Sequence, residues 1–176
     1  MSQMNCSSHD IEAAGRREVS EMRILLAVDG STFSDEAVKE VARRPWPAGT
    51  EVKVVSVVEP VYVTPEPWVG MEEYYRQMDE AARKSAGLAT EGAALMLRTG
   101  EDKSLKVTTE TLVGSPKKEI LDEAERWGAD LIVVGSHGYG FWSSLFLGSV
   151  SHAIATHARC SVEIVKRPAA AESEKK

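Results

Sequence analysis

From Asp130 to Ser151 the sequence reads DLIVVGSHGYGFWSSLFLGSVS. An aliphatic, β-branched run ends at Gly135, and glycine recurs at 138 and 140. Nine residues, 139–147, separate Gly138 from Gly148-Ser149. A run this continuously apolar is typical of a parallel strand covered on both faces. The glycines allow positive φ and close approach to a ligand, and Gly148-Ser149 can begin a helix whose first amides favour a phosphate. The segment therefore predicts a buried strand, an anion-binding loop and a helix, although a plain glycine turn remains the alternative.

Similar apolar runs recur along the chain. These runs are Arg23–Val28, Val52–Val58, Lys106–Val113 and Ser161–Lys166, and with Asp130–Gly135 they make five predicted strands. Helical patterns fill the four gaps between these runs. Five strands joined by four helical crossovers predict a doubly wound α/β domain, with a five-stranded parallel sheet and helices on both faces. In such a sheet the ligand lies beyond the carboxyl ends of the strands, where the strand order reverses.

Local signals mark the ends of three predicted helices. Ser31 or Ser34 can cap the first, which should stop before Pro45. Ser115-Pro116 begins another, which Gly128 ends, and the last follows Gly148-Ser149 and ends near Arg159.

A longer helical pattern runs from Met71 to about Arg98. Apolar residues recur in it at steps of three and four, at Met71, Tyr74, Tyr75, Met78, Ala82, Ala86, Ala89, Ala93 and Met96. This spacing favours a helix that packs one apolar stripe on the sheet. A coiled coil or a partner helix is the alternative.

Composition excludes several classes of protein. Lys and Arg number 21 against 27 Asp and Glu in 176 residues, a formal charge of −6, which argues against a general nucleic-acid binder. A bound anion must then be held locally by backbone amides and hydroxyls. Cys6 and Cys160 form neither a disulfide framework nor a metal motif. No apolar run is long enough for a membrane span or a signal peptide, so we expect a cytoplasmic protein.

Two familiar phosphate loops do not fit the chain. A P-loop needs Lys followed by Ser or Thr after its second glycine, and this loop has no such lysine. The dinucleotide fingerprint would follow the first strand, where Asp29-Gly30-Ser31 offers a single glycine. NAD, FAD and a P-loop mechanism are therefore disfavoured.

The spacing Gly135-x-x-Gly138, nine residues, Gly148-Ser149 resembles the nucleotide-binding signature of the universal stress protein family. Four further stretches resemble the same family: ILLAVDGS at Ile24–Ser31, VVSVVEP at Val54–Pro60, VGSP at Val113–Pro116 and ADLIVVGSHG at Ala129–Gly138. The resemblance covers residues 22–167, which we take as the domain. Residues 1–21 read as a flexible leader and residues 168–176 as a disordered tail.

The resemblance implies strand order 3-2-1-4-5, with ATP across the switch point. It places Ala27 and Asp29 beside ribose and adenine, and the backbone of Val57 against adenine. Ribose and phosphates would be wrapped by Gly135, Ser136, His137, Gly138, Tyr139, Gly140 and Phe141. Gly148, Ser149, Val150 and Ser151 would hold the phosphates, with the hydroxyls of Ser149 and Ser151 as extra donors. Mg²⁺ would accompany the nucleotide, because the site has no lysine to offset the triphosphate.

The resemblance also implies a homodimer in which Ser161–Lys166 pairs with its copy, as an unpaired edge strand allows. The function it implies is that of a nucleotide-dependent regulator or sensor in the stress response, with a possible regulatory protein partner. Asp29 and His137 are the only plausible groups for catalysis, so at most slow ATP hydrolysis is expected. A nucleotide-free interaction protein and a genuine ATPase are the alternatives.

Three features of the sequence allow more than one interpretation. Tyr139, Phe141 and Trp142 occupy a spacer that often carries basic or small residues in the family, and packing or partner contact is favoured over stacking on the nucleotide. Tyr62–Gly70 holds Pro65 and Pro67 and fits a surface connector better than a lid over adenine. His137 could contact phosphate or ribose, or be an exposed loop residue.

Overall fold

The computed structural model describes residues 21–60, 71–100, 102, 104–138 and 147–166. Strands and helices alternate along it. The order is β1 (Arg23–Ala27), α1 (Thr32–Arg43), β2 (Glu51–Val58), α2 (Met71–Thr99), β3 (Lys106–Val113), α3 (Pro116–Trp127), β4 (Leu131–Gly135), α4 (Ser149–His157) and β5 (Ser161–Val165). Each strand boundary agrees with the sequence prediction to within one residue. The expectations for the leader, the tail and the proline-rich stretch lie outside the described residues, apart from Glu21 at the leader's end.

All five strands are parallel and lie in the order β3-β2-β1-β4-β5, which confirms the predicted α/β fold and strand order. The chain moves outward from β1 to β3, then crosses to β4 on the other side of β1. Ala27, the last residue of β1, is in register with Val55 of β2 and Val134 of β4. The carboxyl ends of these three strands therefore meet at one edge of the sheet, where the strand order reverses.

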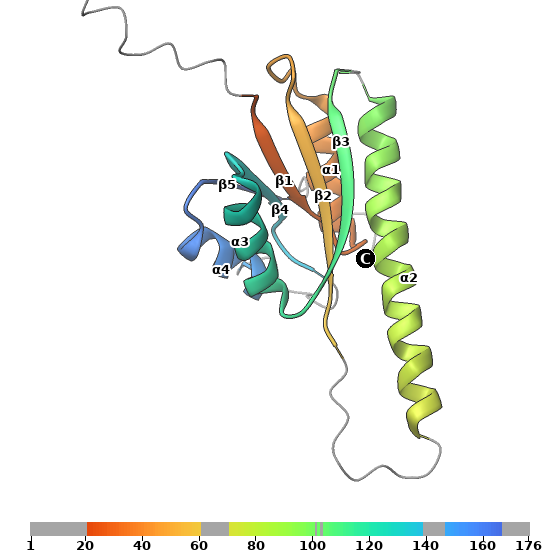
Figure 1. Cartoon of the computed structure of the whole chain (residues 1–176). Coiled ribbons are helices and arrows are strands. Elements are labelled where there is room, and N and C mark those ends of the chain that lie inside the picture. The colour runs from red at the N-terminus through yellow and green to blue at the C-terminus, as the bar shows by residue number, and fades with distance from the viewer. Residues whose placement is uncertain (1–20, 61–70, 101, 103, 139–146, 167–176) are drawn as a thin grey trace, which may run out of the picture.

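Helices cover both faces of the sheet (Figure 1), and one hydrophobic core lies on each face. On one face, Ile24 and Leu26 of β1 pack with α1 and α2. On the other face, Leu25 packs with α3 and α4. Successive residues of β1 thus enter opposite cores, because side chains alternate along a strand. This double burial explains the continuous apolar run, and all five residues of β4 are buried as well.

The predicted helix signals act as expected at two helices. Ser31, rather than Ser34, is the N-cap of α1, and its hydroxyl accepts a hydrogen bond from the Ser34 amide at 3.2 Å. Pro116 occupies the first turn of α3, and Gly128 ends that helix in the left-handed conformation with φ of 70°.

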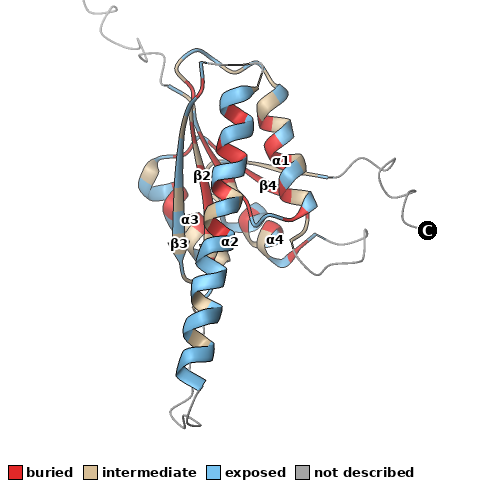
Figure 2. Cartoon of the chain, turned by 90° about the vertical axis from the view of Figure 1, so that its right-hand side faces the viewer, coloured by how far each residue is buried: buried red, intermediate tan, exposed pale blue. Residues whose placement is uncertain are grey.

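Helix α2 differs from its prediction. Its buried residues are Ala86, Thr90, Ala93, Ala94 and Leu97, all in its second half. The first half extends beyond the sheet and is exposed (Figure 2). Met71, Tyr74 and Met78 were expected to face the sheet and instead lie in solvent, because the sheet ends before it reaches them. The packing prediction holds for one half of α2 and is wrong for the other.

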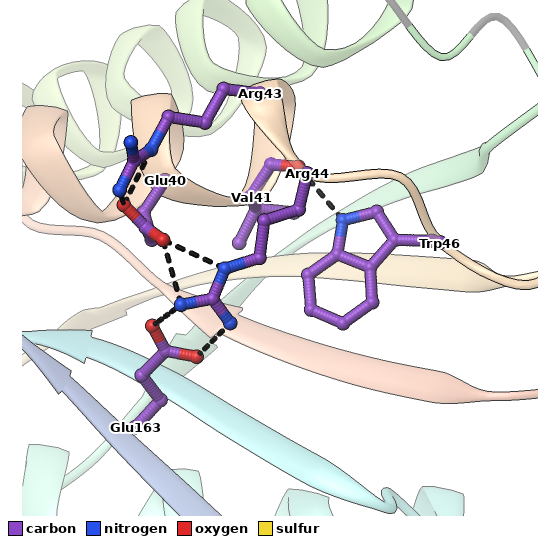
Figure 3. A network of polar contacts seen from close by, with 6 residues as sticks. All are labelled: Glu40, Val41, Arg43, Arg44, Trp46 and Glu163. Carbon is purple, nitrogen blue, oxygen red and sulfur yellow. Dashed lines mark hydrogen bonds and ion pairs between the residues drawn. The ribbon is translucent and has the colours of Figure 1, made fainter.

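A polar network joins the end of α1 to the edge strand β5 (Figure 3). The Arg44 guanidinium donates two hydrogen bonds to the Glu163 carboxylate, at 2.7 and 2.8 Å, and one to Glu40 at 2.7 Å. Arg43 also donates to Glu40. The indole of Trp46 donates to the Val41 carbonyl at 2.8 Å, and Arg44 lies 5.8 Å from the centre of its ring. These contacts fix β5 against α1.

Glu40→Gln should destabilise the protein in a pH-dependent way. Burial works to raise the pKa of the Glu40 carboxyl, but hydrogen bonds and charges from Arg43 and Arg44 outweigh it and hold the pKa below its usual value. The stabilisation is therefore present above the unfolded pKa of about 4.3 and is lost as pH falls through the lower folded pKa. In urea unfolding we expect a loss of about 1 kcal/mol at about pH 7, which shrinks at about pH 3. A pH-independent difference would contradict this assignment.

Candidate functional site

A cavity of about 340 Å³ lies at the carboxyl ends of β1, β2 and β4. The first turns of α1, α3 and α4 also contribute to its wall. Its lining residues are Ala27, Val28, Asp29, Ser34, Val55, Val57, Glu59, Pro116, Ile120, Val134, Gly135, His137, Gly138, Gly148, Ser149, Val150 and Ser151. The cavity thus occupies the point at which the strand order reverses, where doubly wound sheets bind ligands.

One side of the cavity is apolar. Val55 and Val134 flank Ala27 in the sheet, and Ile120 of α3 belongs to the same hydrophobic cluster. Pro116, one turn before Ile120, continues this wall at the start of α3. A surface of aliphatic side chains and a proline ring suits the flat face of an aromatic base.

The beginning of α4 also lines the cavity. Gly148 is the N-cap and has no side chain to cap with, so the first-turn amides of Ser149, Val150 and Ser151 have no capping side chain. The helix is anchored at both ends of this turn, since the Gly148 amide donates to the Ser136 carbonyl and the His152 amide to the Gly148 carbonyl, each at 2.9 Å. Uncapped amides at the positive end of a helix favour an anion.

The charged groups of the cavity are carboxylates. Asp29 and Glu59 line it, and no Lys or Arg is among the described lining residues. The Asp29 carboxylate accepts a hydrogen bond from the Ser31 amide at 2.9 Å, which holds it at the end of β1. An anionic ligand would therefore depend on backbone amides, as the charge of the chain leads us to expect.

The described glycines of the loop allow close packing, and the expectation of positive φ is wrong for them. The glycines with positive φ in the described residues are Gly30, Gly49, Gly114 and Gly128. A Cβ on Gly135 would lie 2.7 Å from the carbonyl atoms of Phe33, and one on Gly138 would lie 2.7 Å from the Asp29 carboxylate. Gly135 and Gly138 thus let β4 and its loop lie directly against α1 and the end of β1.

Two predicted serines are used differently from expectation. The Ser151 hydroxyl donates to the Gly135 carbonyl at 2.7 Å, so its proton is used within the protein. Ser136 is 2% exposed and is not among the cavity-lining residues. Its hydroxyl lies 3.1 Å from Nδ1 of His137 and its amide donates to the Val165 carbonyl, so it supports the loop.

His137 lies at the cavity wall and is oriented by its neighbours. Its ring is 5.0 Å from the ring of Phe33, tilted by 51°, and it also contacts Ser136. This arrangement keeps the imidazole beside the glycine loop. It supports the interpretation of His137 as a site residue.

Most of the predicted site comes together in the structure. The predicted residues that line the cavity are Ala27, Asp29, Val57, Gly135, His137, Gly138, Gly148, Ser149, Val150 and Ser151. Tyr139, Gly140 and Phe141, as well as Trp142, lie outside the described residues. The predicted set leaves out seven of the lining residues, which are Val28, Ser34, Val55, Glu59, Pro116, Ile120 and Val134. Of these, Glu59 and Pro116 follow the carboxyl ends of β2 and β3, the edge of the sheet at which a ligand is expected.

The described ranges contain neither a metal-binding cluster nor a membrane-spanning helix. No group of three or more His, Cys, Asp or Glu side chains there could hold a metal ion. No helix in those ranges is long and apolar enough to cross a membrane.

The universal stress protein family model matches residues 22–166. Curated relatives carry the same family name. Universal stress protein MJ0531 of Methanocaldococcus jannaschii is 31% identical over 148 residues, 83% of this chain and 82% of the relative. A universal stress protein of Thermus aquaticus is 37% identical over 145 residues, 81% of this chain and 97% of the relative.

Solved structures share the fold. The protein MJ0577 superposes with a TM-score of 0.70 at 29% identity, covering 86% of this chain and 99% of that protein. Universal stress protein UspA of Lactobacillus plantarum gives a TM-score of 0.67 at 26% identity, and the match covers 82% of this chain and 97% of that protein. A universal stress protein family protein of Arabidopsis thaliana with AMP bound gives a TM-score of 0.54 at 21% identity. The match covers 88% of this chain and 97% of that protein, and it shows a likeness of fold alone.

Proposed function

Because the chain belongs to the universal stress protein family, we propose that it binds ATP in the cavity at the ends of β1, β2 and β4. In this proposal the protein is a nucleotide-dependent regulator or sensor in the stress response. The observation that carries it is the uncapped first turn of α4, which lines a cavity that is also lined by aliphatic side chains of the sheet and α3. A ligand with an anionic end and an aromatic end matches this lining.

The residues of the cavity fit the parts of the nucleotide. The triphosphate lies against the amides of Ser149, Val150 and Ser151, with the Gly135–Gly138 loop beside it. Adenine lies on the aliphatic wall near Val57 and Pro116. Asp29 is placed between the two walls, next to Gly138, and can accept a hydrogen bond from ribose or base.

Mg²⁺ fits the chemistry of this site through the phosphates. The described lining residues include no Lys or Arg to offset the triphosphate charge, and Mg²⁺ is commonly held by phosphate oxygens with one or two carboxylates and waters. The carboxylates that line the cavity are those of Asp29 and Glu59. When bound, the ion would neutralise phosphate charge.

The protein is proposed to bind ATP with at most slow hydrolysis. Water attack on the γ-phosphate needs a positioned base and groups that stabilise developing charge. Asp29 and His137 are the candidates, and Asp29 already accepts the Ser31 amide. A regulator that reports nucleotide occupancy needs no rapid turnover.

We further propose a homodimer through β5. This strand is the last in the sheet, so one of its edges has no neighbouring strand in the described chain. Pairing with a second copy would satisfy the exposed backbone groups.

Isothermal titration with Mg-ATP tests the nucleotide proposal. We expect saturable binding with one ATP per chain, weakened when Mg²⁺ is removed by a chelator, and a thermal midpoint that rises with ATP. At a hundredfold excess over Kd the stabilisation should be about 2.7 kcal/mol. GTP is the matched control, since it carries the same triphosphate with a different base. Absence of heat and of thermal shift with ATP would overturn the proposal and favour a nucleotide-free interaction protein.

A further inference from the structure

Exposed hydrophobic side chains gather on α2. Six of the eight large hydrophobic residues that are exposed in the described protein belong to this helix, namely Met71, Tyr74, Met78, Leu88, Leu95 and Met96. Leu88 and Leu95 are 62% and 63% exposed, and Tyr74 is 55% exposed. Single exposed leucines need no explanation, but a group on one element marks an interaction surface.

Five of these six residues, all except Met96, lie in one stripe along the helix. Steps of three and four residues connect Met71, Tyr74, Met78, Ala81, Ser85, Leu88, Gly92 and Leu95. We call this set the α2 stripe. Its members are all exposed, and the residues that bury α2 against the sheet, such as Ala86 and Ala93, occupy other positions of the same repeat. The alternating step is the pattern of a helix that packs along another helix.

The projecting half of α2 has no core of its own. None of the residues 71–85 is buried, and this half extends past the sheet (Figure 2). It carries internal ion pairs from Arg76 to Glu73 and Glu80, and from Arg83 to Asp79. Such exposed pairs add only a few tenths of a kcal/mol each, and most of the stability of a helix in a protein comes from packing of an amphipathic face. An added helix on the stripe would stabilise it.

Charge indicates which helix would pack there. Lys84 and Glu91 flank the stripe one residue before Ser85 and Gly92, and both are exposed. Neither makes an ion pair within the described chain. In an antiparallel pair of identical helices, Lys84 of one copy can lie beside Glu91 of the other, and symmetry repeats the contact.

The same register matches large and small side chains. With Lys84 beside Glu91, Met78 packs on Leu95 of the second copy, Ser85 on Leu88 and Ala81 on Gly92. Gly92 lies inside a helix, where glycine costs about 1 kcal/mol relative to alanine. A Cβ there would meet nothing within 4 Å, so the chain's own packing does not require this glycine. A glycine on the stripe would allow close approach of a second helix.

We propose that the α2 stripe binds the α2 stripe of a second copy in an antiparallel pair, with Lys84 and Glu91 in reciprocal contact. This surface lies beside β3, at the edge of the sheet opposite β5 (Figure 1). It is therefore independent of any pairing through β5. If both interfaces form, the chain assembles beyond a dimer.

Sedimentation velocity of the full chain across about 1 to 100 µM tests the pairing. Lys84→Glu places like charges at both contacts, so we expect Kd to rise about tenfold and the mass at intermediate concentration to fall toward half. The double variant Lys84→Glu/Glu91→Lys restores the reciprocal pairs and should recover the wild-type mass. Leu88→Glu should raise Kd about a hundredfold.

Glu72→Lys is the matched control, since it reverses an exposed charge on the same helix away from the stripe. It should leave the mass unchanged. Circular dichroism checks that each variant keeps its helix content, and ATP titration should give the same affinity in all of them. A Leu88→Glu mass equal to that of the wild type, or a double variant no better than Lys84→Glu, would overturn the proposal.

Discussion

Gly148→Val should abolish measurable ATP binding in a chain that still folds. A Cβ at this position would lie 3.2 Å from the His137 Cα and 3.3 Å from the Ser136 carbonyl oxygen, both backbone atoms. The two valine methyl groups add to this crowding, so the start of α4 must move away from the loop. The amides of Ser149 and Val150 then lose their alignment. Losing two charge-assisted hydrogen bonds raises Kd about a hundredfold or more.

The measurement is the same Mg-ATP titration, with unfolding in urea as the check on the fold. Gly87→Ala is the control, because a Cβ at Gly87 meets nothing within 4 Å and α2 lies away from the cavity. We expect wild-type affinity in that variant. Equal affinity in Gly148→Val and the wild type would remove α4 from the binding site.

Lys53→Met should destabilise the protein strongly, because it breaks an ion pair with a buried carboxylate. Glu123 is 1% exposed and its carboxylate accepts hydrogen bonds from Lys53, at 2.7 Å, and from Arg126. Removing Lys53 leaves one carboxylate oxygen buried without its partner. Such a loss costs about 3 kcal/mol in the unfolding free energy. Urea unfolding at constant pH measures it.

The double variant Lys53→Met/Glu123→Leu distinguishes the cost of an unpaired buried carboxylate from the cost of lost side-chain packing. Replacing both partners with apolar residues removes the unpaired carboxylate, so the double variant should be more stable than Lys53→Met. The side chain of Lys53 also lies 5.2 Å from the centre of the Trp127 ring, a contact that methionine keeps in apolar form. If the double variant loses more than the single one, the buried carboxylate is not the cause.

The fold was predictable because local signals agree with one another. Apolar runs such as LIVV at 131–134 are continuous because both faces of the sheet are covered. Ser31 and Gly128 begin and end helices through hydrogen bonds and backbone conformation that depend on nearby residues only. These features need no knowledge of distant contacts.

The sequence predictions that are wrong concern contacts between segments that lie far apart in the chain. The sequence spacing of α2 cannot reveal that the sheet ends before Tyr74, so its apolar face was assigned to the core. The sequence predicts positive φ at the loop glycines, whereas Gly135 is required by its close approach to the Phe33 backbone of α1. The Ser151 hydroxyl was assigned to phosphate and instead binds Gly135. Each correction depends on a contact between segments far apart in sequence or across a loop.

A crystal structure grown with Mg-ATP tests the central proposal most directly. We expect the triphosphate against the amides of Ser149, Val150 and Ser151, and adenine on the wall formed by Val57 and Pro116. Nucleotide bound elsewhere, or an empty cavity at saturating ATP, would contradict the assignment of this site.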